Sequence, residues 1–153
     1  MSAIFHAGIS GYRGRMGRAV SQVLDAREDV VVAARFDWGE TADISLCDVI
    51  IDFSTPDASV ALAQSAAERR GPALVIGFAA ETTDLEANAR SKLSRKGCDW
   101  IVGNDVSADV FGADGNTVLL VTKDGADTWP RLSKTEVAAH LADRIADHFS
   151  PKA

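Results

Sequence analysis

Apolar and polar positions follow two alternating spacings along the chain, and these spacings predict strands and helices in turn. Short apolar runs rich in β-branched residues predict six strands, at residues 4–9, 30–35, 49–52, 73–76, 99–102 and 117–122. Apolar residues spaced three or four apart predict helices over residues 15–26, 55–70, 83–96 and 133–149. This order predicts an α/β Rossmann-like three-layer fold, with a mostly parallel sheet of about six strands and an antiparallel edge strand.

Capping patterns mark where three of these helices begin. The patterns are Thr55-Pro56-Asp57, Thr83 with Glu86, and Ser133 with Glu136. The link between the fifth and sixth strands has no helical spacing, so we expect the sixth strand to return antiparallel at the sheet edge. The fourth strand is expected to stop at Gly77, and the end of such a strand is where an α/β protein usually holds its ligand.

Composition narrows the classes to which the protein can belong. The chain has 153 residues, 46% hydrophobic and 25% charged, which fits one Rossmann-like domain over residues 1–153. Its formal net charge of −6 and the lack of a basic stripe argue against a nucleic-acid partner. We expect no membrane span and no signal peptide, and hence a cytoplasmic location. Cys47 and Cys98 are expected to be reduced, buried thiols.

The strongest chemical motif is the glycine loop GISGYRGRMG at residues 8–17. Gly11, Gly14 and Gly17 lie three apart between the first strand and the first helix. Glycine there lets backbone N–H groups approach a pyrophosphate at the helix N-terminus. Asp37, at the end of the second strand, lies where an acid would bind the ribose hydroxyls of an adenine nucleotide. The same glycines could instead serve only the close packing of helix on strand, and the two arginines of the loop could be solvated surface charges.

GYRGRMG together with VIIDFSTP at residues 49–56 resembles the cofactor domain of dihydrodipicolinate reductase, over residues 1–77. The resemblance implies that NAD(H) or NADP(H) is bound by residues of the loop and of the second and third strand ends. These are Gly11, Tyr12, Arg13, Gly14, Arg15 and Met16, with Asp37 on the adenosine ribose and Phe53 and Ser54 beside the dinucleotide. The reductase family continues with a Gly-Thr-Thr-Gly turn, whereas this chain reads GFAA at 77–80, so the resemblance ends there.

Residues 75–149 are similar to a second family, the C-terminal part of phosphopantothenoylcysteine synthetase. The similarity rests on VIGFAAETTDLEANARSKLSRKGCDWIVGNDVS, on FGADGN and on TWPRLSKTEVAAHLADRIADHF. It implies a CTP-dependent ligase in which Phe78, Lys92 and Lys96 contact CTP. The two lysines could equally be cations that are favoured near a helix C-terminus. Because the synthetase family is dimeric, residues 110–116 and the sixth strand could preserve a homodimer interface.

The two resemblances meet at residues 75–77, which suggests an engineered or recombined chimera. Three hypotheses follow: a non-catalytic domain that binds NAD(H) weakly, a CTP-binding protein derived from the ligase, or a fold that binds no ligand. Calorimetry with CTP and ADP-ribose would separate the first two. The scattered histidines and cysteines show no catalytic triad and no metal-ligand spacing, so we expect no catalytic residue and no metal. His140 and His148 are expected on the solvated side of the last helix.

Overall fold

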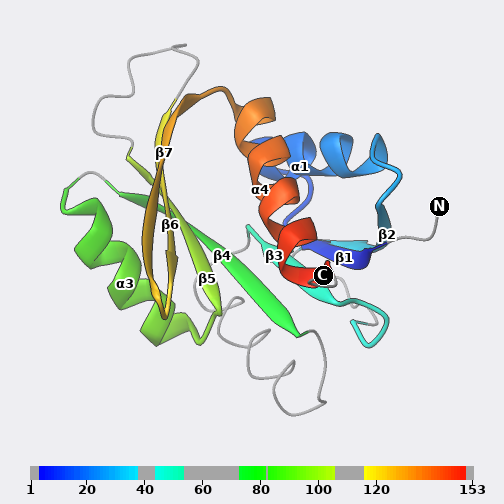
Figure 1. The fold of residues 1–153 in the computed structure, drawn as a ribbon, viewed down its shortest axis with the longest axis horizontal. Coiled ribbons are helices and arrows are strands. Elements are labelled where there is room, and N and C mark those ends of the chain that lie inside the picture. The colour runs from blue at the N-terminus through cyan, green and yellow to red at the C-terminus, as the bar shows by residue number, and fades with distance from the viewer. Residues whose placement is uncertain (1–3, 38–43, 54–72, 82, 106–115, 151–153) are drawn as a thin grey trace.

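The computed structural model describes residues 4–37, 44–53, 73–81, 83–105 and 116–150. Its centre is a seven-stranded sheet in the order β2-β1-β3-β4-β5-β6-β7 (Figure 1). The strands are β1 Phe5–Ser10, β2 Val30–Phe36, β3 Val49–Asp52, β4 Leu74–Glu81, β5 Trp100–Asp105, β6 Asn116–Thr122 and β7 Gly125–Leu132. The helices are α1 Arg15–Asp25, α3 Leu85–Lys96 and α4 Lys134–Phe149. The helix predicted at 55–70 lies outside the described residues.

The predicted three-layer α/β fold is confirmed. Strands β2, β1, β3, β4 and β5 are parallel, whereas β6 is antiparallel to both β5 and β7. Helices α1 and α4 lie side by side on one face of the sheet, and α3 covers the other (Figure 1). Alternate strand residues point to the two faces. Ile76 and Val102 therefore join the α1 and α4 core, while Ile101 and Leu119 pack against α3.

The edge of the sheet differs from the prediction. The sixth strand does return antiparallel, but β7 lies outside it and forms the edge. The segment Gly125–Leu132 contains Pro130 and buries only Trp129 well, so it lacks the apolar alternation that marks a strand in sequence. The sheet therefore has seven described strands rather than about six.

The fourth strand does not stop at Gly77 but continues to Glu81. Gly77 is a point of close packing inside β4. A Cβ atom there would lie 2.9 Å from Ile101 Cδ1 and 3.1 Å from Cys98 Sγ. The glycine thus makes room for side chains beneath the strand, and the strand end lies several residues later than expected.

The two predicted capping boxes have different outcomes. At α4 the box is confirmed, because the Glu136 N–H donates to Ser133 Oγ and the Ser133 N–H donates to Glu136 Oε1. At α3 the prediction is wrong: Asp84 is the N-cap, so Glu86 is the second helical residue rather than the third. Glu86 instead pairs with Arg90 one turn later, at 2.9 Å.

His148 is exposed, as the sequence analysis expected, whereas His140 is half-buried. The His140 ring lies 4.4 Å from the Trp129 ring, and the His148 ring lies 5.4 Å from that of Trp100. The two rings thus meet tryptophans of two different strands, β7 for His140 and β5 for His148. In the part of the chain that the structure describes, no helix is both long and apolar enough to cross a membrane.

Candidate functional site

One edge of the sheet gathers most of the residues that the sequence analysis singled out. The carboxyl ends of β1, β3, β4 and β5 meet there because these strands are parallel. Strand β7 is antiparallel to β6 and therefore ends at the same edge, where α4 begins. Helix α1 also begins there, after the glycine loop. Ligands of open α/β sheets bind at this edge, so we take it as the candidate site.

Packing explains two of the three loop glycines. Gly11 has a positive φ of 75°, and a Cβ atom there would lie 3.0 Å from the Phe53 carbonyl carbon. A Cβ atom at Gly17 would lie 2.7 Å from the Tyr12 Cα atom and clash with the Gly11 carbonyl oxygen. Close packing therefore explains why glycine is needed at Gly11 and Gly17, while a contact of Gly11 with a nucleotide stays a prediction.

Gly14 is different from its two neighbours in the motif. It is the N-cap of α1, and its φ of −72° suits any residue. The nearest atom to a Cβ placed there is the Gly11 carbonyl oxygen, at an ordinary 3.6 Å. Packing among the described residues thus does not require glycine at this exposed position, which leaves room for a ligand at the start of α1.

The structure brings Asp37 to the glycine loop, as the spacing suggested. Asp37 Oδ2 accepts a hydrogen bond from the Arg13 backbone N–H at 3.3 Å. The Arg13 guanidinium lies over the Tyr12 ring, 4.9 Å from its centroid. Asp37 therefore supports the conformation of the loop directly. A role on a ribose stays a prediction.

Two phenylalanines, one from each half of the chain, meet above the strand ends. The rings of Phe53, after β3, and Phe78, in β4, lie 4.2 Å apart between centroids with an interplanar angle of 42°. Both rings are half-buried and pack on the core formed with α1 and α4. The aromatic pair could offer a flat surface to a nucleotide base. Ser54, the neighbour of Phe53, lies outside the described residues.

A narrow pocket of about 20 Å³ lies beside Phe78, between α1 and α4. Its lining includes Met16 of α1, Asn104 of β5 and Lys134 of α4. The Asn104 Oδ1 atom is buried and has no hydrogen-bond donor among the described residues. A buried amide oxygen without a donor is costly, so it is suited to accept a hydrogen bond from a ligand or water.

Lys134 was missed by the sequence analysis. It is the first residue of α4, directly after the N-cap Ser133, and its side chain is half-buried. A cation is disfavoured at that end of a helix, because the helix dipole places positive charge there. That mismatch is the signal that could have identified it. Arg15 occupies the equivalent first position of α1.

The two lysines of α3 lie on the other face of the sheet from the Phe78 ring. Lys96 is only 9% exposed, and its Nζ atom donates to the Phe78 carbonyl oxygen at 3.3 Å. Lys92 lies one turn earlier on α3 and is half-buried. Lys96 and Phe78 are therefore in contact, but through the backbone of β4. Contact of either lysine with CTP stays a prediction.

No disulfide joins the two cysteines; Cys47 is buried as expected, whereas Cys98 is only half-buried. Burial raises the pKa of the Cys98 thiol from 9.0 to about 11. Within the described residues, no group of three or more metal-binding side chains comes together.

The raised pKa of Cys98 predicts a loss of stability at alkaline pH. The protonated Cys98 thiol makes its full contribution to the free energy of unfolding below pH 9. That contribution falls as the pH rises toward 11, because the unfolded chain loses the thiol proton at a lower pH than the folded chain. We expect a decrease of about 2 kcal/mol. Denaturant titrations at pH 8 and pH 11 measure it, with Cys98→Ala as the matched control. An equal decrease in both proteins would contradict the assignment to Cys98.

Proteins with two different names are similar in sequence to this chain. A 4-hydroxy-tetrahydrodipicolinate reductase of Caulobacter vibrioides is 46% identical over 105 residues, covering 61% of this chain and 41% of that protein. The coenzyme A biosynthesis bifunctional protein CoaBC of Bacillus subtilis is 44% identical over 82 residues, covering 52% of this chain and 20% of that protein. The CoaBC of Vibrio cholerae is 32% identical over 133 residues, covering 86% and 32%. The chain spans less than half the length of each of these relatives.

Solved structures share the fold. The C-terminal domain of CoaBC superposes with a TM-score of 0.67 at 22% identity, covering 94% of this chain and 95% of that one. A DNA/pantothenate metabolism flavoprotein from Streptococcus pneumoniae superposes with a TM-score of 0.68 at 14% identity, covering 95% and 99%.

The match to a protein family crosses the point where the sequence analysis placed a junction. It begins at residue 15, in α1, and ends at residue 149, whereas the resemblance to the synthetase was expected to begin only at about residue 75. A chimera is thus not confirmed. The chain belongs to the family described as the DNA/pantothenate metabolism flavoprotein C-terminal domain.

Proposed function

We propose that this chain binds a nucleoside triphosphate, CTP, at the carboxyl edge of its sheet. One observation carries the proposal: α1 and α4 both begin at this edge, each with a basic residue at its first position, Arg15 and Lys134. Helix N-termini present unpaired N–H groups and positive partial charge. Two of them with added cations favour a highly charged anion, although the chain as a whole is acidic.

The neighbouring groups suit the remaining parts of a nucleotide. The buried Asn104 Oδ1 atom can accept a hydrogen bond, such as one from an exocyclic amine of a base. The Phe53 and Phe78 rings supply an aromatic surface. We propose cytosine as the base because the resemblance to phosphopantothenoylcysteine synthetase implies a contact between Phe78 and CTP, and because several relatives are CoaBC proteins.

The pocket must open to admit this ligand. Its volume of about 20 Å³ is far below that of a nucleotide base. A shift of the Phe78 ring, which lines the pocket and packs on the Phe53 ring, or of the Lys134 side chain would make room. We therefore expect CTP binding to change the environment of both rings, which aromatic NMR resonances would report.

A second candidate is binding of the adenosine part of NAD(H), and two observations favour it. Asp37 lies beside the glycine loop, and one relative bears the name of a reductase. Against it, Asp37 Oδ2 already accepts the Arg13 N–H, so binding a ribose would compete with that hydrogen bond. This candidate also leaves Asn104 and Lys134 without a role.

Calorimetric titration with CTP, ADP-ribose, NADH and NADPH separates the two candidates. We expect CTP to bind more tightly than ADP-ribose. The Lys134→Ala substitution should lower the affinity for CTP at least about tenfold, because a charge-assisted contact to phosphate is lost. Arg90→Ala on the exposed face of α3 is the matched control and should leave the affinity unchanged. Tighter binding of ADP-ribose, with no effect of Lys134→Ala, would favour the dinucleotide instead.

A further inference from the structure

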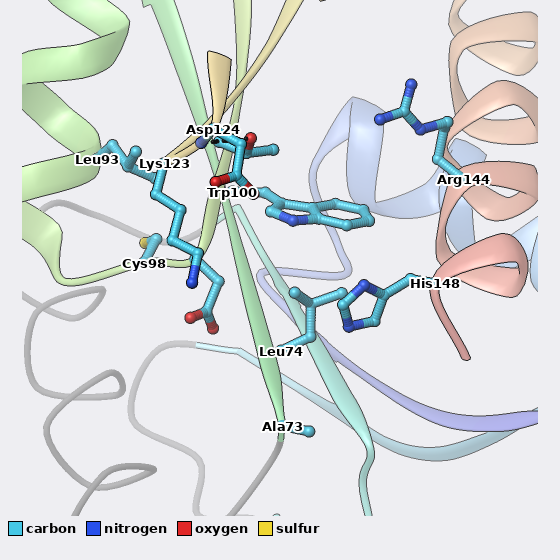
Figure 2. Close-up of a pocket in the computed structure, with 11 residues that line it drawn as sticks. Ala73, Leu74, Leu93, Cys98, Trp100, Lys123, Asp124, Arg144 and His148 are labelled. Carbon is cyan, nitrogen blue, oxygen red and sulfur yellow. Dashed lines mark hydrogen bonds between the residues drawn. The ribbon is translucent and has the colours of Figure 1, made fainter. Parts of the chain in front are cut away.

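A second and larger cavity opens at the opposite edge of the sheet from the proposed nucleotide site. Its volume is about 580 Å³, within the range of small-molecule sites. It lies where β4 and β5 begin, at Leu74 and Trp100, and where β6 turns into β7, at Lys123 and Asp124. Residues of α4, of α3 and of these strands line it, as Figure 2 shows.

The centre of this cavity is aromatic. The Trp100 indole lies across it, and the His148 ring meets the indole edge-on, at 5.4 Å and 84° (Figure 2). The Leu93 side chain, which is half-buried, adds apolar surface, while Leu74 lines the cavity but is only 2% exposed. Trp100 is only 9% exposed, whereas His148 is exposed. A flat aromatic group that enters the cavity can therefore contact the uncovered part of the indole together with the His148 ring.

The rim of the cavity carries charges of both signs. Lys123 and Arg144 are basic, whereas Asp99 and Asp124 are acidic. Arg144 is partly neutralised, because its Nη1 atom donates to Asp127 Oδ2 at 2.7 Å. A ligand with a single charge would meet a repulsive partner on this rim, while a ligand with both charges can pair each of its ends.

We propose that this cavity binds a small zwitterion with an aromatic side chain, such as a free aromatic amino acid. Its carboxylate would lie toward Lys123, its ammonium group toward Asp124, and its ring against Trp100. The cavity and the nucleotide site lie at opposite edges of the sheet, so both ligands can bind at once. This site is independent of the identity of the nucleotide.

Four small molecules test the charge requirement. L-phenylalanine carries the ring and both charges, 3-phenylpropionate lacks the ammonium group, phenethylamine lacks the carboxylate, and L-alanine lacks the ring. Ligand-observed NMR on the whole chain is expected to show saturable binding of L-phenylalanine, with each analogue at least about tenfold weaker. Absence of binding at about 10 mM L-phenylalanine, or equal affinity for an analogue, would overturn the proposal.

Two variants test whether L-phenylalanine binds in this cavity. Lys123 and Asp124 are exposed residues of a turn, so Lys123→Ala and Asp124→Asn should fold normally. Each is expected to lower the affinity for L-phenylalanine at least about tenfold, whereas Arg90→Ala, outside the cavity, should leave it unchanged. Saturating CTP is expected to leave the affinity unchanged. Unaltered affinity in both turn variants, or competition by CTP, would overturn the proposal.

Discussion

Alanine at Gly17 is expected to lower the free energy of unfolding by about 3 kcal/mol. The added Cβ atom would lie 2.7 Å from the Tyr12 Cα atom and would clash with the Gly11 carbonyl oxygen. Overpacking usually costs 1–3 kcal/mol, and the upper end applies because both obstacles are backbone atoms that cannot rotate away. Gly11 cannot move aside easily either, since its own backbone packs on Phe53.

Chemical denaturation followed by circular dichroism measures this loss. Gln22→Ala is the matched control, because Gln22 is exposed on the same helix and should change stability by less than about 0.5 kcal/mol. A Gly17→Ala variant that unfolds without a cooperative transition would agree with the expectation. A midpoint equal to that of the wild type would show that the loop can relax around the new methyl group.

The parts of the fold that were predictable are those with strong periodicity. Strand β3 and the capping box of α4 lie where the sequence indicates, because a continuous apolar run and a Ser-x-x-Glu pattern are local signals. Strand β7 was missed because it is an edge strand with one well-buried side chain, Trp129. The end of β4 was misplaced because Gly77 signals a strand end in sequence but in fact serves a close side-chain contact.

Only those parts of the candidate site that follow a regular residue spacing in the sequence were predictable. The glycine loop and Asp37 form a recognisable pattern, and the structure places them together. The contact between the Phe53 and Phe78 rings depends on the pairing of β3 with β4, which no local pattern reveals. The position of Lys134 beside Asn104 likewise depends on β7, the strand that the sequence analysis did not identify.

Hydrophobic contacts run across residues 75–77 without interruption. Ile51 before this segment, Ile76 within it and Val102 after it belong to one core, and α1 packs against α4. The sheet pairs β3 with β4 in register from Val49 to Asp52. Such agreement between local signals and global packing is expected of a sequence that folds to a single structure.

The Gly14→Ala substitution is expected to leave the fold intact and to lower the affinity for CTP at least about tenfold. Stability should stay within about 1 kcal/mol of the wild type, because the poorer N-cap is offset by a less flexible unfolded chain. Binding should suffer because Gly14 is exposed at the start of α1, where a phosphate oxygen accepting backbone N–H groups would contact a new methyl group.

Gly14→Ala and Gly17→Ala are chemically the same change three residues apart, so together they separate the two roles of a glycine loop. The structure predicts opposite results: loss of stability at Gly17, and loss of nucleotide affinity with stability retained at Gly14. Gly14→Ser is an informative third variant, since serine is a good N-cap and should preserve or raise stability while still obstructing the phosphate. Calorimetry with CTP, performed on proteins whose unfolding midpoints match the wild type, provides the measurement. Wild-type CTP affinity in both Gly14 variants would mean that no phosphate lies against the start of α1, and the proposed orientation of the nucleotide would be wrong.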